Sequence, residues 1–155
     1  MILNYWNMKH YVSKETAIKL KEIGFNEYCK SAFISEIVEE EGIEPEELGW
    51  YADEVFINYT TFSNQDWKGV TTIPEMYEVQ DWFRDKEVII EVFFKSHINT
   101  YEVYIARNKR YNEELQEFRF TEWISDENYK DYYEALEAGI LKAIEIYESN
   151  IKIHN

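Results

Sequence analysis

Few side chains in this sequence have the types and the spacing that a reactive site requires. The three histidines, His10, His97 and His154, lie far apart, and none has a second His or Cys at ligand spacing. A zinc site is therefore not expected. Cys29 is the only cysteine, and no histidine near it in the sequence could act as its base. We interpret Cys29 as a small buried residue and not as a nucleophile.

Glycines and carboxylates give no clearer sign of catalysis. The five glycines never cluster, so they cannot build a phosphate-binding loop. Glu39, Glu40 and Glu41 are consecutive, and consecutive side chains diverge around a helix, which favours a solvated face. We predict no catalytic residue, no bound metal and no cofactor, and hence a protein that is not an enzyme.

The most regular part of the sequence runs from residue 73 to residue 148 and predicts a helix, three strands and a second helix. Pro74 stands in the first turn of the first helix, where proline is favoured, and this helix should end near Glu87. Its apolar stripe, at offsets of three and four, is Met76, Val79 and Phe83.

Three extended segments follow this helix, with apolar or aromatic residues alternating with polar ones. The segments are residues 88–95, 100–106 and 116–124. Short links between consecutive strands predict an antiparallel meander. In the first strand one face is uniformly apolar, with Val88, Ile90, Val92 and Phe94. Glu91 lies on the other face, where it could pair with Lys95 or Arg119 across the sheet.

The last helix has the clearest start signal in the chain. Asp131 with Glu134 three residues later matches a capping box in its Asp form, so we predict a helix from Tyr132 to about Glu148. Gly139 lies beside its apolar stripe, and a mid-helix Gly costs about 1 kcal/mol against Ala. Close approach of another element is the expected reason for this glycine. The stripe itself comprises Leu136, Ile140, Ala143, Ile144 and Tyr147.

Before residue 73 the pattern is weaker, although one helix is well marked. Ser13 caps its start, and Gly24 ends it in a left-handed conformation that should fold Phe25 back on Leu20 in a Schellman motif. Three further segments are short: a strand candidate at 32–34, a helix candidate at 35–41 and a fourth strand candidate at 54–61.

These elements predict an α+β fold. Its core is an antiparallel sheet of three to four strands with helices packed on one face, in the order helix, strand, strand, strand, helix, preceded by an N-terminal helix. We expect one domain over residues 1–155. Residues 1–72 contribute the N-terminal helix, an acidic segment and the possible extra strand, and residues 73–148 contribute the core.

The net charge of −15 is uneven, because residues 31–70 carry one Lys and ten acids. Nucleic acids and anionic membranes require a basic footprint, so neither is an expected partner. The expected partner is instead a protein with a basic surface. Aromatic residues make up 17% of the chain, including thirteen Tyr, so some must be exposed, as at recognition surfaces.

The candidate partner-binding residues follow from these two anomalies. They are Glu39, Glu40, Glu41, Glu46, Glu47, Trp67 and Trp82. Trp82 has an alternative reading, because it stands about 100° around the helix from Phe83 and could instead cap the edge of the sheet. The single cysteine, the absence of an export leader and the short apolar runs predict a protein of the cytoplasm.

Three blocks of the sequence carry a resemblance. They are AIKLKEIGFNEYC at 17–29, IPEMYEVQDWFRDK at 73–86 and YYEALEAGILKAIEIY at 132–147. Their order and spacing resemble a broad set of small, uncharacterised phage and prophage proteins, from which the sequence departs at its first residues and in the acidic stretch 36–47. The resemblance implies a mobile-element setting in the cytoplasm of a host cell, with no activity to transfer.

Two functional hypotheses follow. In the first, the chain is non-catalytic and binds a protein of the host or the phage through its acids and surface tyrosines. In the alternative, it mimics nucleic acid, so that its carboxylates stand in for phosphates and occupy the basic groove of a host or defence protein. Mimicry needs rows of acids, and Lys and Arg interrupt the acids after residue 67.

Overall fold

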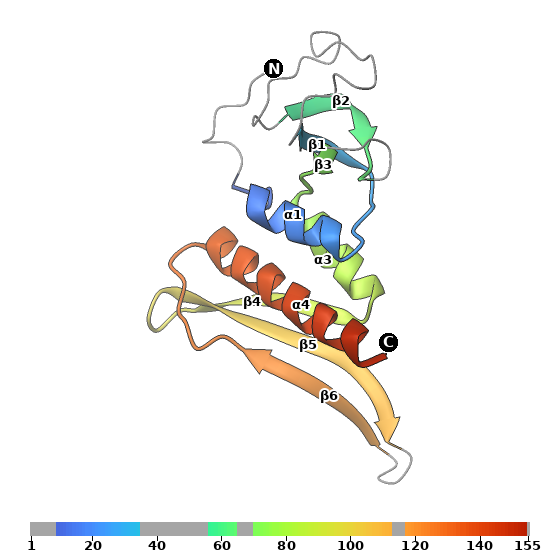
Figure 1. Cartoon of the computed structure of the whole chain (residues 1–155). Helices are drawn as coiled ribbons and strands as arrows, with labels where there is room; N and C mark the ends of the chain where they lie inside the picture. The colour runs from blue at the N-terminus through green and yellow to red at the C-terminus, as the bar shows by residue number, and fades with distance from the viewer. Residues whose placement is uncertain (1–8, 35–55, 65–69, 113–116, 155) are drawn as a thin grey trace. The chain divides into compact units, whose positions relative to one another are not determined.

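The computed structural model describes residues 9–34, 56–64, 70–112 and 117–154 (Figure 1). In this part of the chain it has three helices and two three-stranded antiparallel sheets, so the predicted α+β class is confirmed. The chain divides into two compact units, residues 1–75 and residues 76–155. This boundary lies close to the division predicted between residues 72 and 73. The expectation of a single domain stays a prediction.

Unit 1 begins with the helix α1, Lys14–Glu22, whose two ends are those predicted. The Ser13 hydroxyl accepts a hydrogen bond from the Thr16 N–H at 3.2 Å, which satisfies one of the unpaired donors of the first turn. At the other end Gly24 has φ +91° and the Phe25 N–H donates to the Leu20 carbonyl at 2.9 Å. Phe25 and Leu20 are fully buried, which completes the Schellman motif.

The sheet of unit 1 is built around one central strand. This strand, β1 (Cys29–Ile34), pairs with β2 (Phe56–Phe62) on one side and β3 (Val70–Thr72) on the other. Both pairings are antiparallel. The strand candidate at 32–34 is confirmed, and the fourth strand candidate forms as β2 but joins this sheet instead of the meander. The helix candidate at 35–41 lies outside the described residues.

Buried polar groups connect the segments of unit 1. The Asn64 side chain donates to the Phe25 carbonyl at 2.6 Å and accepts from the Thr72 N–H at 2.9 Å. Ser63 donates to the Asn26 carbonyl at 3.1 Å. These hydrogen bonds fix the end of α1 to the strands that follow, because a buried polar group left unpaired would cost stability.

Unit 2 begins with α3, Met76–Asp85, which starts two residues after Pro74. Pro74 belongs to unit 1, where its carbonyl accepts from the Val12 N–H at 3.2 Å while Glu75 forms a bridge with Tyr11. Because Pro74 and Glu75 make these extended contacts, the helix begins at Met76 and not at Pro74, where the sequence placed its first turn. The helix ends where predicted, with Glu87 in the left-handed region at φ 62°.

The three predicted strands form a meander in the order β4-β5-β6, with both pairings antiparallel. The strands are β4 (Val88–Lys95), β5 (Thr100–Asn112) and β6 (Glu117–Ile124). Strand β5 continues six residues beyond the predicted end at Ala106, through an irregularity between Arg107 and Arg110. The sequence did not predict this continuation, because residues 107–112 (RNKRYN) are mostly polar and lack the apolar alternation of the first part of the strand.

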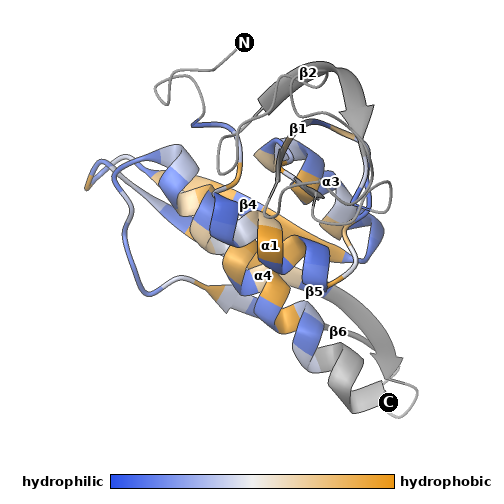
Figure 2. Ribbon diagram, turned by 45° about the horizontal axis from the view of Figure 1, so that its top comes forward, coloured by the Kyte–Doolittle hydropathy of each residue, from blue (hydrophilic) through white to orange (hydrophobic). Residues whose placement is uncertain are grey.

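The helix α4, Tyr132–His154, contacts both β4 and β5 (Figure 1). Its cap is the predicted one, because the Asp131 carboxylate accepts from the Tyr133 and Glu134 N–H groups at 2.9 and 3.2 Å. Apolar and hydrophilic residues alternate along α4 in Figure 2, as expected for an amphipathic helix. Within the described residues, no helix combines the length and the apolar character needed to cross a membrane.

Gly139 brings α4 close to the sheet. A Cβ atom at this position would lie 2.7 Å from Val103 Cγ1 and 3.0 Å from Ile90 Cγ2. Both distances are shorter than ordinary van der Waals contact, so the predicted reason for this glycine is confirmed. The buried residues of α4 that surround this contact are Ala135, Leu136, Ile140, Ala143 and Ile144.

Candidate functional site

The meander of unit 2 has two faces of opposite character. Side chains alternate along each strand, and the register aligns Ile90 with Ile105 and Val92 with Val103 on the face that α4 contacts. On this covered face Ile90, Val103 and Ile105 are at most 3% exposed. The covered face is thus part of the core of unit 2.

We call the opposite side of the meander the open face. Its residues are Ile89, Glu91, Phe93, Lys95, Glu102, Tyr104, Ala106, Glu122 and Ile124, placed there by strand alternation and register. Three of them are large apolar side chains that remain accessible: Ile89 is 39% exposed, Phe93 50% and Ile124 52%. The two outer strands, β4 and β6, therefore present apolar side chains that the described residues leave accessible.

Tyr104 lies in the middle of the open face. It stands opposite Glu91 on one side and Ile124 on the other, and its ring centroid is 6.2 Å from that of Phe93 in an edge-to-face arrangement. Its hydroxyl donates to Glu122 Oε1 at 2.7 Å. This hydrogen bond raises the pKa of Tyr104 above 10.0, with smaller contributions from burial and from the negative charges of Glu122 and Glu91.

The charges of the open face are mostly negative. Lys95 Nζ lies 2.7 Å from Glu102 Oε1 in an ion pair whose side chains are about a quarter exposed. Glu91 makes no ion pair with another of the described residues, so the pairing expected for it with Lys95 is wrong; the Arg119 side chain lies outside the described part. The open face therefore combines accessible apolar side chains with two carboxylates that no cation balances within the described structure.

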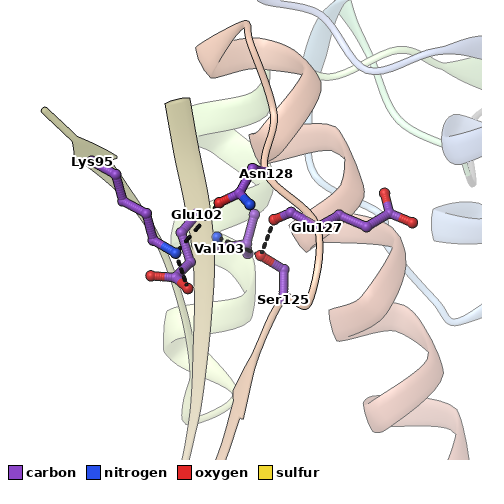
Figure 3. A network of polar contacts seen from close by, with 6 residues as sticks. All are labelled: Lys95, Glu102, Val103, Ser125, Glu127 and Asn128. Carbon is purple, nitrogen blue, oxygen red and sulfur yellow. Dashed lines mark hydrogen bonds and ion pairs between the residues drawn. The ribbon is translucent and has the colours of Figure 1, made fainter. Parts of the chain in front are cut away.

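A turn after β6 completes one end of this surface (Figure 3). Ser125 follows the last residue of β6, and its hydroxyl accepts from the Val103 N–H at 3.0 Å and donates to the Glu127 carbonyl at 3.1 Å. This arrangement carries the chain past β5, so that Asn128 Oδ1 lies 3.4 Å from Lys95 Nζ. The buried Ser125 side chain thus accepts a hydrogen bond from the backbone of β5 and holds the turn that places Asn128 beside Lys95 of the open face.

A second group of accessible aromatic rings lies on the covered side of the sheet, at the end where β4 turns into β5. Phe94 is 53% exposed and its ring centroid is 5.2 Å from that of Tyr101, which lies 5.9 Å from Tyr132. Tyr132 in turn lies 5.4 Å from Tyr133. These rings surround the start of α4, so the expectation that some tyrosines lie at the surface agrees with the structure.

The predicted contact residues are only partly within the described structure. Trp82 is 5% exposed and packs edge-to-face on Phe83 at 5.0 Å and on Tyr147 at 5.6 Å between centroids. Lys86 Nζ stands 4.0 Å from the Trp82 ring centroid. A side chain so deeply packed cannot be a surface contact, and the alternative reading of Trp82 as a packing residue applies. The other candidates lie outside the described residues, namely Glu39, Glu40, Glu41, Glu46, Glu47 and Trp67.

The residues considered for chemistry form no reactive group among the described residues of either unit. Cys29 is 1% exposed and its thiol donates to the Glu27 carbonyl at 3.5 Å, as the buried reading predicts. His97 is exposed in the turn between β4 and β5, and His10 lies 3.9 Å from Glu75 in unit 1. Nowhere in the described ranges do three or more His, Cys, Asp or Glu side chains gather in a group that could hold a metal ion.

Sequence reasoning did not single out Phe93, Tyr104 or Ile124 as surface residues. A signal was present, because adjacent aromatic residues such as Phe93 and Phe94 must point to opposite sides of a strand. Only one of the two sides of the strand could belong to the predicted core. Comparison of the chain with protein-family models, with curated proteins and with solved structures found no match in any of the three.

Proposed function

We propose that this protein acts without catalysis by binding a protein partner, and that the open face of unit 2 is the contact surface. The observation that supports the proposal is the accessible apolar surface at Ile89, Phe93 and Ile124, opposite a face of the same sheet on which Ile90, Val103 and Ile105 are buried beneath α4. Accessible apolar side chains gathered on one side of a sheet, with charged residues among them, are typical of an interaction site.

The composition of the open face fits a contact surface. Phe93 and Tyr104 offer large aromatic areas, and Tyr104 keeps a polar tip that is already held by Glu122. Aromatic residues are frequent among the side chains that dominate binding energy, because they bury much area at a low entropic cost. The central strand β5 is hydrogen-bonded on both sides, so the surface is formed before a partner arrives.

The setting of this binding follows from the resemblance to phage and prophage proteins. It supports a partner that is a protein of the host cell or of the phage, met in the cytoplasm. The acids and the tryptophan predicted as contacts lie outside the described residues, and their part in binding stays a prediction.

The proposal is tested by affinity capture with matched variants. Tagged wild-type protein, the double variant Phe93→Asp/Ile124→Asp and the control Tyr28→Asp are expressed in the same host and the captured proteins are identified by mass spectrometry. Tyr28 is an accessible aromatic residue of unit 1, 65% exposed. We expect one protein to be held by the wild type and the control and to be lost from the double variant.

Circular dichroism must show that the double variant keeps its fold, as expected for changes at accessible positions. Recovery of the same proteins at equal yield with all three baits would contradict the open face as the contact surface.

A further inference from the structure

We infer that the segment recognised by the open face is a basic amphipathic stretch of polypeptide, with an apolar stripe flanked by Lys or Arg. This inference rests on the proposed function and names the chemistry of the partner. It follows from the way in which carboxylates and accessible apolar side chains are interleaved across the three strands.

The interleaving is set by the register of the sheet. Phe93 on β4 stands opposite Glu102 on β5, and Tyr104 on β5 stands opposite Glu91 on β4. On β6 the accessible Ile124 follows Glu122 at the next position on the same face. Any segment that covers the two aromatic rings must therefore also cover, or lie directly beside, carboxylates.

These carboxylates differ in what already balances them. Glu102 has Lys95 at 2.7 Å, whereas the one partner of Glu122 among the described residues is a neutral donor, the Tyr104 hydroxyl. Glu91 and Glu122 therefore carry charge that a partner would partly remove from water. Desolvation of a carboxylate is unfavourable unless an opposite charge or a hydrogen-bond donor meets it. A neutral or acidic segment would desolvate these carboxylates without a compensating attraction, whereas Lys or Arg would offset the desolvation with an ion pair.

The same charges argue against a second copy of this chain as the occupant. A symmetric pairing through the open face would place Glu91 and Glu122 against an identical surface. The one lysine of that surface, Lys95, is already held by Glu102 and Asn128. Like charges brought together at an interface are unfavourable, so a basic partner fits where a second copy does not.

The test uses a library of random peptides of 16 residues displayed on particles, which assumes no particular partner and no particular secondary structure. The library is selected on the immobilised full chain, with Phe93→Asp/Ile124→Asp protein as the counter-selection. Peptides that survive are synthesised, and their affinities are measured by fluorescence anisotropy at low and at high salt. The measurements are repeated with the variants Phe93→Ala and Glu91→Gln, and with Tyr28→Asp as the control.

We expect the selected peptides to combine apolar residues with net positive charge and to bind less tightly at high salt, since salt screens charges at a surface. Phe93→Ala should weaken binding about tenfold or more, as loss of a central aromatic contact does. Glu91→Gln should weaken it about two- to fivefold, the range of an accessible ion pair. Tyr28→Asp should have no effect.

Two other outcomes are distinguishable. Neutral or acidic peptides that depend on Phe93 but not on Glu91 or salt would overturn the inference about charge and leave the proposed function standing. Failure to select any peptide that depends on Phe93 would overturn the inference together with the open face as a contact surface.

Discussion

The two faces of the β4-β5-β6 meander differ although consecutive residues of the same strands build them. Ile89 and Ile90 are neighbours of identical type on β4, yet Ile89 is 39% exposed and Ile90 only 3%. Helix α4 lies on the side of Ile90, where Gly139 allows it to approach Ile90 and Val103 closely. The comparison teaches that burial in this unit depends on what packs against a side chain and not on the side chain itself.

The largest expected effect is a difference in the free energy of unfolding between a variant of the covered face and a variant of the open face. Ile140→Ala on the covered side should lower the free energy of unfolding by about 2–5 kcal/mol, because Ile140 is fully buried and its loss leaves a cavity. Ile124→Ala on the open face should change it by about 0.5 kcal/mol or less. Chemical denaturation of both variants checks this difference. Equal losses would mean that the open face is as well packed as the core.

A second prediction concerns the close approach of α4 to the sheet. Gly139→Ala should lower stability by up to about 2 kcal/mol, because overpacking of about 1–3 kcal/mol exceeds the helix preference of Ala of about 1 kcal/mol. In a Val103→Ala background the same change should be tolerated, since the atom nearest to the new Cβ is gone. A double-mutant cycle measured by denaturation gives the coupling. Stabilisation by Gly139→Ala alone would refute the tight contact.

A smaller effect is expected for the ion pair of the open face. Lys95→Met removes the partner of Glu102 and should lower stability by about 0.2–1 kcal/mol at low salt. The loss should shrink at high salt, where accessible charges are screened. Thermal denaturation at two salt concentrations measures it, with Lys130→Met as the control for loss of an exposed positive charge. A loss above that range would show that this pair is buried more deeply than the structure indicates.

The smallest effect is the titration of Tyr104. Its raised pKa means that the folded chain keeps this proton at a pH where the unfolded chain loses it, so stability should fall as the pH rises above 10.0. Glu122→Gln removes the carboxylate and should lower the pKa of Tyr104, which NMR titration of the ring resonances can follow. Glu148→Gln, on α4, should leave it unchanged. No shift in the Glu122 variant would contradict the hydrogen bond as the main cause.

Sequence reasoning recovered the features of this protein that depend on nearby residues. The caps at Ser13 and Asp131 were predicted because each uses hydrogen bonds within three residues. Both the glycine that ends α1 and the one inside α4 were also predicted, although for different reasons. Gly24 is needed for its positive φ and has nothing within 4 Å of a would-be Cβ, whereas Gly139 is needed because it leaves room.

The errors arose where distant segments decide the outcome. Residues 54–61 were a candidate for a fourth strand of the main sheet, but β2 instead pairs with β1, a partner far away in the sequence. Trp82 could not be assigned, because its burial depends on Tyr147 of α4. The candidate site was missed because the alternation in β4 marks the uniformly apolar face as the core face but does not show whether another segment covers the apolar side chains of the opposite face.

By itself the sequence determined the kinds of elements, most of their ends and the acidic, aromatic character of the surface, because hydrogen-bonded caps and side-chain periodicity act over a few residues. Tertiary structure alone decided how the strands divide between two sheets and that the apolar side chains on the second side of the meander stay accessible. The physical reason is that burial is a property of pairs of segments: the apolar residues of β4 acquire opposite roles only when α4 packs on one side of them.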